Sequence, residues 1–366
     1  MPIKIINPRI EDDLLLAQFY ERVYRFDHIL TDKRFRSWWL RANPNYKGQG
    51  YSCKVAVLDG EFIGHCAYIP VSLWSGERTY RAVWGGNFIV DKRFRGRGIG
   101  RQLHQAINQE VEVFLDVGAN ATARDILRKF GWLNFGSLNR AVGVLDAGAA
   151  QFAIARKLSP AEMITVPPNV PETRVTNFKH CGEEVDDFWL CLRPGLINAT
   201  ERSATFLNWR YLNHPFFDYQ TLVVWEGGKM VGLAVFRFQT VPEHRATLMR
   251  VVEFLAPPKT GRSLLAALVG LAREKSAALI DFFCAGRSHL DFFQDFGFLL
   301  SPAADQFTRL FDPVDLARPG FGTISFNGGN IHSRLPAEIF NRQENWYVTS
   351  GDGDQDRPNR ILPPIV

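Results

Sequence analysis

The chain repeats its own sequence at an offset of about 170 residues, and this repeat constrains the fold more than any other feature. Four segments of the first half return in the second half in the same order. "FRSWWLRANP" returns as "TFLNWRYLNHP", "VAVLDGEFIGHC" as "VVWEGGKMVGLA", "VWGGNFIVD" as "MRVVEFLAP", and "ILRKFGWLNF" as "HLDFFQDFGFLL". One short match would be chance, but four in order indicate a duplicated domain. The length of 366 residues also agrees with two domains.

A proline-rich stretch separates the two halves. "LSPAEMITVPPNVPETR" holds four prolines and no hydrophobic periodicity, which is typical of a linker. We therefore expect a first domain at residues 1–158, a linker at 159–173, a second domain at 174–335 and a C-terminal extension at 336–366.

Local patterns in the first half predict alternating strands and helices. "KVAVLDGEFIGHCAYIPV" predicts two strands joined by a turn at Asp59 and Gly60, and "RAVWGGNFIV" predicts a third strand. "GRQLHQAINQEVEVFLD" predicts a helix and "VGANA" a short strand. "ARDILRKFGW" predicts a further helix that ends at Gly131.

The stretch "DKRFRGRGIGRQL", residues 91–103, lies between a predicted strand and a predicted helix. Glycines let the backbone adopt positive φ and approach a ligand closely. Several amide groups can then converge on one anion at the helix N-terminus, and arginines add counter-charge. This arrangement suits a pyrophosphate.

Other readings of this loop fit less well. A Walker A loop needs Gly-Lys-Ser/Thr at its end, but Arg101 follows the last glycine. A dinucleotide-binding loop needs G-x-G-x-x-G close to its strand, whereas this spacing is G-x-G-x-G after five intervening residues. An RNA-binding arginine-glycine tract is normally repetitive, and this stretch is single. A merely solvated basic turn stays open as an alternative.

The loop and a segment downstream resemble the GCN5-related N-acetyltransferase (GNAT) family. Its signature [R/Q]-x-x-G-x-[G/A] is filled by Arg95, Gly98 and Gly100 in "RGRGIG". A second family signature is matched in "NATARDILRKFGW", where Asn120 and Ala123 take the expected positions. The resemblance covers residues 1 to about 150 well and the second half as a degenerate copy.

The resemblance implies an α/β (α+β) fold of two tandem GNAT-like domains, each a mixed central sheet flanked by helices, the second degenerate. It implies acyl-CoA, either acetyl-CoA or another short-chain acyl-CoA, as cosubstrate without a metal, lying in a splay between two strands. Backbone amides of the loop would hold its pyrophosphate, strand residues would pair with its pantetheine arm, and a backbone N–H of Phe88 or Ile89 would stabilise the oxyanion. The cofactor-binding residues implied are Phe88, Ile89, Val90, Arg95, Gly96, Arg97, Gly98, Ile99, Gly100 and Asn120.

The family chemistry is direct attack of a neutral amine on the thioester. Many members place a tyrosine as acid for the departing thiolate at the position that Leu127 takes here, so the usual acid is absent. Candidate catalytic residues are His65 as a base, Asn87 as a positioning group and Glu253 as a base. Glu253 is the most interesting because it lies between apolar residues in "VVEFL".

The second domain has no counterpart of residues 91–103, here called the glycine-arginine loop, and is predicted to contact the substrate. Trp209, Arg210 and Tyr211 in "NWRYLNHP" are the candidates, since an arginine can grip phosphate and aromatic rings can stack on a base or sugar. An alternative is that Trp209 and Tyr211 pack in the core. Tandem proteins of this kind resemble bacterial nucleotide-sugar N-acyltransferases of surface-polysaccharide pathways.

Composition limits the remaining function classes. The formal net charge of +5 is too small to argue for nucleic acid by itself. Five cysteines without a C-x-x-C pattern fit neither a disulfide framework nor a zinc site, and no apolar stretch is long enough to span a bilayer. The tail "TSGDGDQD" carries Asp352, Asp354 and Asp356, which lack the glycine and distal glutamate of a calcium loop; one of them could contact a substrate amine.

The sequence therefore predicts a cytoplasmic acyl-CoA-dependent N-acyltransferase with no nucleic-acid, membrane or metal partner. The predicted acceptor is a small-molecule amine, the amino group of a nucleotide-linked sugar. The alternatives are a peptide, aminoglycoside or polyamine acceptor, or a non-catalytic module that binds CoA or nucleic acid.

Overall fold

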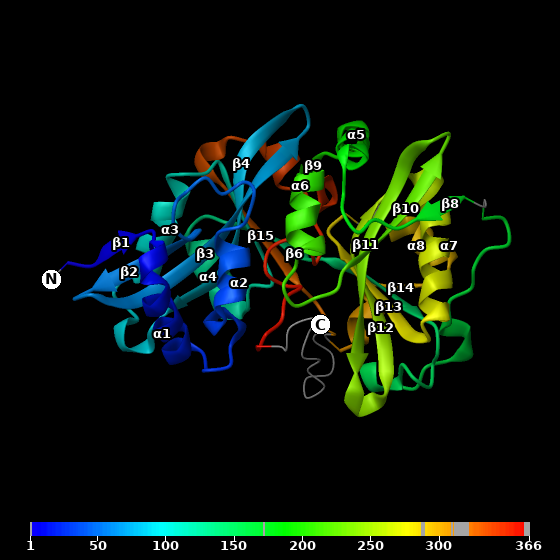
Figure 1. Cartoon of the computed structure of the whole chain (residues 1–366), viewed down its shortest axis with the longest axis horizontal. Coiled ribbons are helices and arrows are strands. Elements are labelled where there is room, and N and C mark those ends of the chain that lie inside the picture. Colours follow the sequence, from blue (N-terminus) through cyan, green and yellow to red (C-terminus); the bar gives the residue numbers. More distant parts are fainter. Residues whose placement is uncertain (1, 171–172, 287–289, 309, 311–321, 362–366) are drawn as a thin grey trace.

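The chain folds around two mixed β-sheets that lie side by side (Figure 1), as seen in a computed structural model. The structure describes residues 2–170, 173–286, 290–308, 310 and 322–361. The first sheet has nine strands and the second has seven. This arrangement confirms the predicted fold class of two mixed sheets flanked by helices.

The first sheet is built mainly from the first half of the chain. Its strand order is β1-β2-β3-β4-β5-β15-β6, and the short strands β9 and β16 extend it beside β3. Their bounds are β1 (Lys4–Ile6), β2 (Cys53–Leu58), β3 (Glu61–Ser75), β4 (Arg78–Val90), β5 (Val113–Val117), β6 (Leu133–Ser137), β9 (Asn198–Thr200), β15 (Ser325–Asn330) and β16 (Trp346–Tyr347). Helices α1 (Asp13–Val23) and α2 (Lys33–Leu40) pack on one face, and α3 (Ile99–Asn108) and α4 (Ala121–Lys129) pack on the other.

The second sheet has the same topology. Its order, β8-β10-β11-β12-β13-β7-β14, repeats the first sheet strand for strand, with one parallel pair (β12 and β13) where the first has β4 and β5. The strands are β7 (Asn139–Val144), β8 (Arg174–Thr176), β10 (Gln220–Glu226), β11 (Lys229–Val241), β12 (Ala246–Leu255), β13 (Ala277–Cys284) and β14 (Leu299–Leu300). The helices that follow in this half are α5 (Glu183–Leu192), α6 (Ala204–Leu207), the π-helical turn η7 (Asn208–Leu212), α7 (Pro258–Glu274), α8 (Asp291–Asp295) and α9 (Ala337–Phe340).

Short 3₁₀ turns connect these elements. They are η1 (Ile10–Asp12), η2 (Ile29–Thr31), η3 (Lys92–Phe94), η4 (Gln151–Ala153), η5 (Pro160–Glu162), η6 (Arg193–Gly195), η8 (Pro242–His244), η10 (Ala304–Gln306), η11 (Ile331–Ser333) and η12 (Gln343–Asn345).

The two sheets exchange one strand each. β7 lies in the first half of the sequence but pairs with β13 in the second sheet, and β15 lies in the second half but pairs with β5 in the first sheet. These two strands thus pair with strands on the other side of the domain boundaries predicted from the sequence. The boundaries themselves stay a prediction. Each sheet needs the other half of the chain for its completion.

The repeated tryptophans meet at the junction of the two halves. Trp38 and Trp209, which occupy equivalent positions of the repeat, stack with ring centroids 5.7 Å apart. Each indole N–H donates to the backbone carbonyl of the other residue, at 2.8 Å and 3.0 Å. Both side chains are buried in a core cluster that draws residues from both halves.

Most local predictions for the first half are confirmed. Asp59 and Gly60 form the predicted turn between β2 and β3, both with positive φ, and "RAVWGGNFIV" lies in β4. α4 ends just before Gly131, whose φ is +82°.

Two local predictions are wrong, and they concern the same stretch. The predicted helix from Gly100 to Asp116 stops at Asn108, and its last part is β5. "VGANA", predicted as a strand, is mainly the turn between β5 and α4. "VEVFLDV" alternates apolar and other residues with the period of a strand, but its apolar positions also continue a helical stripe.

We predict that Trp209→Ala destabilises the protein by about 3–5 kcal/mol, because it leaves a cavity at the junction and removes the ring stack with Trp38 and the indole N–H that donates to the Trp38 carbonyl. Urea-induced unfolding measures this loss. Leu14→Ala, at an exposed position, is the control and should cost less than about 0.5 kcal/mol. An equal, small effect of both variants would contradict the role of the tryptophan pair.

Candidate active site

Strands β4 and β5 run together for a short distance and then diverge. They pair in parallel only between Ala82–Trp84 and Val113–Leu115, although β4 continues to Val90. The backbone groups of β4 beyond Trp84 are therefore not paired with β5. A slot opens between the two strands, and it is the position where an extended ligand can add its own polar groups to β4.

A bulge in β4 lies at the start of this slot. The pairing of β3 with β4 shifts register between His65 and Ala67, and Asn87 takes a φ of +48°. The His65 ring supports the bulge because its Nδ1 lies 3.0 Å from the Asn87 carbonyl, while its Nε2 lies 2.8 Å from the Tyr20 hydroxyl. Burial lowers the pKa of His65 to about 4, so its ring is neutral near pH 7.

The glycine-arginine loop joins the end of β4 to α3. Asp91 accepts a hydrogen bond from the Arg93 amide and starts the turn η3. Gly96 and Gly98 have φ of +81° and +72°, and Gly98 is the N-cap of α3. The amides of the first turn of α3 therefore face the groove, where an anion also meets the positive end of the helix dipole.

A groove of about 600 Å³ runs from this loop along β4 toward α4. It leads into an inner pocket of about 200 Å³, and the two share Phe88, Asn120 and Ala123. The groove is lined by Phe88, Ile89, Val90, Phe94, Arg95, Gly96, Gly98, Ile99, Gly100, Arg101, Asn120, Thr122, Ala123 and Ile126. The path from the loop to the slot is therefore continuous.

The predicted cofactor residues lie along this groove, apart from Arg97, whose guanidinium stands over the Phe94 ring at 5.3 Å. Arg95 donates to the Val90 carbonyl at 3.1 Å. The Asn120 side chain caps α4 by accepting from the Ala123 amide at 2.9 Å. The loop and the unpaired edge of β4 fit a ligand with a pyrophosphate at one end and an amide-containing arm at the other.

The inner pocket ends at two carboxylates. Asp116 of β5 and Asp354 of the C-terminal segment both line it, together with Leu127 of α4. Burial and the nearby Asp354 charge raise the pKa of Asp116 to about 7. The sequence analysis predicted a helix for "VEVFLD" and therefore did not identify Asp116 as a residue of this pocket.

The C-terminal segment reaches this pocket by crossing between the two sheets, where it is the red trace in Figure 1. Its residues bridge the second sheet at Cys284 and Thr349 and the first half at His28 and Arg360. The three aspartates alternate in direction. Asp352 and Asp356 point into the second half, and Asp354 points into the pocket.

Asp352 and Asp356 bind buried arginines. Asp352 contacts Arg202 at 2.8 Å. Asp356 contacts Arg237 at 2.8 Å and Arg250 at 3.4 Å. These guanidinium groups hold the pKa of Asp356 well below its usual range, in spite of its burial. Gln355 completes the attachment by donating to the Val117 carbonyl at 2.9 Å.

Arg357 ties the segment to the bulge of β4. It donates to the Asn87 side-chain oxygen at 2.9 Å and lies 3.6 Å from Asp354. Asn87, predicted as a positioning group, therefore lies beside both Asp354 and Arg357 in the inner pocket. His65 stands directly behind it.

The other predicted residues lie apart from the groove. Glu253 is fully buried in β12, where it contacts Arg202 at 2.7 Å and accepts from the Tyr211 hydroxyl at 2.7 Å. Arg210 donates to the carbonyls of Gly351 and Gly353 and so holds the C-terminal segment. Trp209 and Tyr211 are buried in the core, in agreement with the packing alternative.

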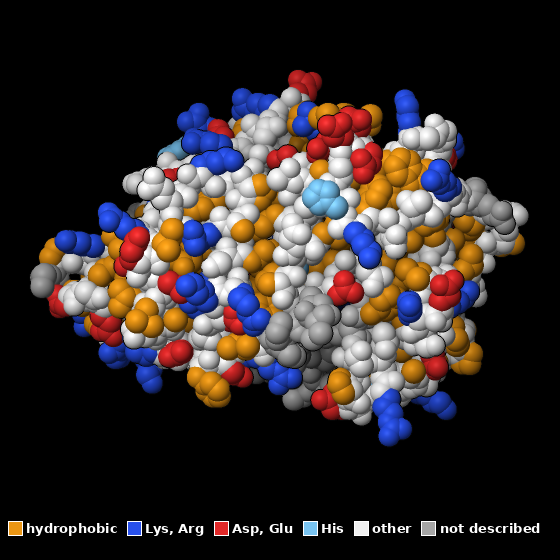
Figure 2. All heavy atoms as spheres, in the orientation of Figure 1, with side chains coloured by type: hydrophobic (Ala, Val, Ile, Leu, Met, Phe, Trp, Pro, Cys, Tyr) orange, Lys and Arg blue, Asp and Glu red, His pale blue; other side chains and the backbone are white. Residues whose placement is uncertain are grey.

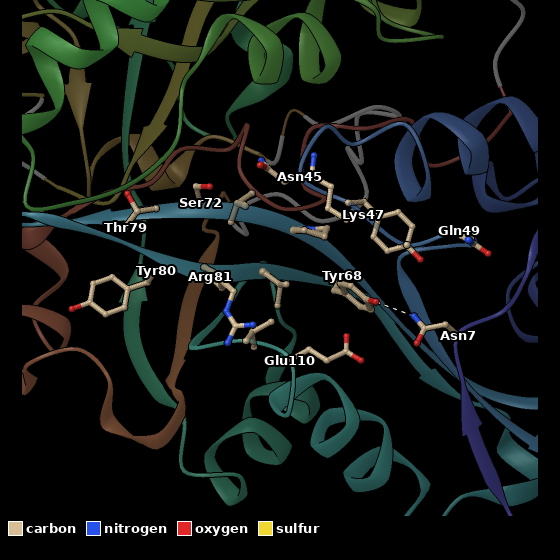
Figure 3. Close-up of a pocket in the computed structure, with 18 of the residues that line it drawn as sticks. Asn7, Asn45, Lys47, Gln49, Tyr68, Ser72, Thr79, Tyr80, Arg81 and Glu110 are labelled. Atoms are coloured by element: carbon tan, nitrogen blue, oxygen red, sulfur yellow. Dashed lines mark hydrogen bonds between the residues drawn. The ribbon is translucent and has the colours of Figure 1, made fainter.

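A separate hollow of about 610 Å³ lies at the far end of α3 (Figure 3). It shares no lining residue with the groove. Its floor includes Thr79–Val83, the part of β4 before the slot, and Asn7 donates to the Tyr68 hydroxyl at 2.9 Å across one side. Its other lining side chains include Tyr46, Lys47 and Glu110.

On the face seen in Figure 2, acidic side chains gather over α5, and basic and acidic side chains are mixed elsewhere. Within the described residues, no group of three or more His, Cys, Asp or Glu side chains is arranged to hold a metal ion. Among the helices described, none has the length and apolar character that crossing a bilayer requires.

The fold and the groove define an α/β domain in which a glycine-rich loop lies at one end of a groove and an unpaired stretch of β4 runs along it. Residues 13–132 match the Acetyltransferase (GNAT) family. The match covers about a third of the chain, so the similarity concerns this domain and not the second half.

Solved structures agree on the fold. A GCN5-related N-acetyltransferase from Kribbella flavida has a TM-score of 0.60 at 14% identity over 93% of this chain and 74% of that one. A probable N-acyltransferase from Enterococcus faecalis V583 has a TM-score of 0.61 at 12% identity over 90% and 73%. A GCN5-related N-acetyltransferase from Anabaena variabilis ATCC 29413 has a TM-score of 0.55 at 13% identity over 77% of this chain and 66% of that one. A search of curated protein sequences found no significant match.

We predict that Asp356→Ala costs about 3–5 kcal/mol of stability at pH 7, because it leaves Arg237 and Arg250 buried without their carboxylate. The folded-state pKa of Asp356 is depressed, so its contribution is present above the unfolded pKa of about 3.9 and is lost as the pH falls below it.

Urea unfolding at pH 7 and at lower pH measures both effects. The variant should be less stable than the parent at pH 7, and the difference should shrink in acid. Asp27→Ala, which removes a half-exposed pair with Arg25, is the control. A constant difference at all pH values would contradict the assignment.

Proposed function

We propose that this protein transfers an acetyl or other short acyl group from acyl-CoA to the primary amine of a nucleotide-linked amino sugar. The proposal rests on one observation: the groove from the glycine-arginine loop ends at a slot in the sheet that two carboxylates close. An activated acyl group on one side and an acceptor for amine protons on the other are what N-acylation needs.

The groove favours a short acyl group. The loop amides would hold the pyrophosphate, and the free edge of β4 would pair with the pantetheine arm. The inner pocket, with about 200 Å³, has to take the end of this arm and the acyl group together. Phe88, Phe114 and Trp132 enclose it.

The acceptor approaches from the opposite face of the sheet. Asp354 lies on that side. A Cβ atom added to Gly86 would lie 3.1 Å from the Trp39 ring of α2 and 3.2 Å from the Asp354 Oδ2, so both side chains lie on the same face of β4. Tyr24 and His28 stack at 4.2 Å nearby, and the charge of Arg357 acts on both. Aromatic rings and a cation are groups that hold a sugar and a diphosphate, which supports a nucleotide-linked acceptor.

The chemistry follows from this placement. The amine loses a proton and its nitrogen forms a bond to the thioester carbonyl carbon. A backbone N–H of β4 at Phe88 or Ile89 stabilises the oxyanion. The carbon–sulfur bond then breaks, and the products are the amide and CoA.

The direct test is a screen of dTDP- and UDP-linked amino sugars against acetyl-CoA and longer acyl-CoAs, with release of free CoA as the readout. We expect saturable release only with an amino sugar present. Turnover with peptides, aminoglycosides or polyamines alone would replace the acceptor class. CoA binding without turnover on any amine would indicate a non-catalytic CoA-binding module.

We predict that Arg95→Glu weakens CoA binding at least about 10-fold, because it puts a negative charge beside the pyrophosphate site. Isothermal titration with CoA measures the affinity. Arg128→Glu, a charge reversal at an exposed position of α4, is the matched control and should bind as the parent does. CoA binding that survives Arg95→Glu unchanged would refute the assignment of the loop.

A further inference from the structure

We propose that Asp354 and Asp116 divide the proton transfers of the reaction between the two faces of the sheet. Asp354 accepts the proton of the amine, and Asp116 donates a proton to the departing sulfur of CoA. This inference rests on the proposed N-acyl transfer and assigns its two missing proton carriers.

Asp116 lies on the cofactor side of the slot. On β5 it alternates with Leu115 and so faces the same side as Phe114, which packs in the cluster of α3 and α4. It is half-buried and borders the inner pocket. The pocket also contains Leu127, at the position where related enzymes carry the tyrosine acid, so Asp116 stands close to where that acid would act.

Asp116 is held in place by groups from both halves of the chain. The Ala119 amide donates to its Oδ1 at 3.2 Å. Asn327, its register partner on the exchanged strand β15, also hydrogen-bonds to the carboxyl group. A carboxyl fixed on two sides keeps one orientation toward the pocket.

Asp354 lies on the acceptor side. Its Oδ1 accepts from the Gln355 side chain at 2.8 Å, and Arg357 lies 3.6 Å from its Oδ2. The Asn87 amide lies 3.4 Å from the same Oδ2. Its carboxylate oxygens lie among donors, and they can also accept a hydrogen bond from an ammonium group of the acceptor.

The carboxyl groups of Asp116 and Asp354 have different neighbours, and this difference assigns them different roles. The groups that face Asp116 are Asp354 from the C-terminal segment, Asn327 from β15 and the Cys66 thiol from β3. None of these three is a cation, so burial and the Asp354 charge keep much of Asp116 protonated near pH 7. Asp354 has Arg357 and remains the proton acceptor.

The nearby histidines are poor alternatives as the acid. Both ring nitrogens of His65 are engaged with Tyr20 and Asn87. His104 borders the inner pocket, but burial among aromatic rings lowers its pKa to about 4, so it carries no imidazolium proton near pH 7. Of these three side chains, Asp116 is therefore the one with a proton to give near pH 7.

The step balances in protons and electrons. The ammonium proton of the acceptor goes to Asp354, and the freed lone pair forms the carbon–nitrogen bond. When the carbon–sulfur bond breaks, its electron pair stays on sulfur, which takes the proton of Asp116. A carboxyl with a pKa of about 7 can protonate a thiolate whose conjugate acid has a pKa near ~8.5. The proton on Asp354 then restores Asp116, directly or through water, and the second amine proton leaves to solvent.

The first test needs no acceptor. We expect NMR of protein labelled with ¹³C at its aspartate carboxyl groups to show one carboxyl that titrates near pH 7. The signal should be absent in Asp116→Asn and should move to lower pH in Asp354→Asn, because that change removes the like charge. Asp125→Asn, on the exposed side of α4, is the control and should leave the titration unchanged.

The second test is the pH profile of kcat with acetyl-CoA and an amino sugar that turns over. The parent should lose activity above about pH 7 as Asp116 loses its proton. Asp116→Asn should lower kcat at least about 100-fold and remove this decline. Asp354→Asn should also lower kcat, because it removes the proposed proton acceptor, and should move the remaining decline to lower pH.

The outcomes separate the two proposals. If the parent shows no turnover with any amine, the proposed function fails whatever the titration shows. If the parent turns over but Asp116→Asn keeps both its rate and its decline in base, the assignment of Asp116 is overturned. If Asp354→Asn leaves the Asp116 titration unmoved, the coupling of the two carboxyl groups is overturned.

Discussion

The ion pairs between the C-terminal segment and the buried arginines of the second half fix this segment at the candidate active site. Asp352 and Asp356 are fixed by Arg202 and Arg237 on either side of Asp354. Between them the chain turns and bends, with Gly353 at a φ of +65°, and Asp354 lines the inner pocket instead. A carboxylate at the end of a chain would otherwise sample many positions, and catalysis needs it in one.

This attachment gives the second half a structural role at the candidate site. Its β12 and β13 pair over five positions, Thr247–Val251 with Ala277–Phe282, where the first sheet pairs over three before it opens. Arg250 and Asp281 occupy this closed region, and β12 passes to α7 without a glycine-arginine loop. In the second half the equivalent region holds Arg250 and Asp281, and Arg250 also contacts Asp356 of the C-terminal segment.

The sequence predicts what local geometry determines, and it fails where partners are distant. The repeat was enough to predict two sheets, and the glycines of residues 91–103 were enough to predict the loop. The exchange of β7 and β15 could not be predicted, because an apolar strand suits either sheet and only the three-dimensional pairing selects one. Asp116 was missed because its segment also fits a helical pattern. Glu253 was a candidate because it is an acid among apolar residues, and its partner Arg202 could not be identified because it lies 51 positions away in the sequence.

The strand exchange also determines how the proposed acid is tuned. Asn327, which bonds to Asp116, arrives on β15, and Asp354, which raises its pKa, arrives on the C-terminal segment, so both come from beyond the second sheet. The first half alone would have the loop and the slot, but Asp116 would lack its neighbouring charge. A carboxyl without that charge, and with more contact to water, would ionise closer to its ordinary pKa and would have no proton to give near pH 7. Under the proposed assignment, proton donation in place of the usual tyrosine at Leu127 would need both halves of the chain.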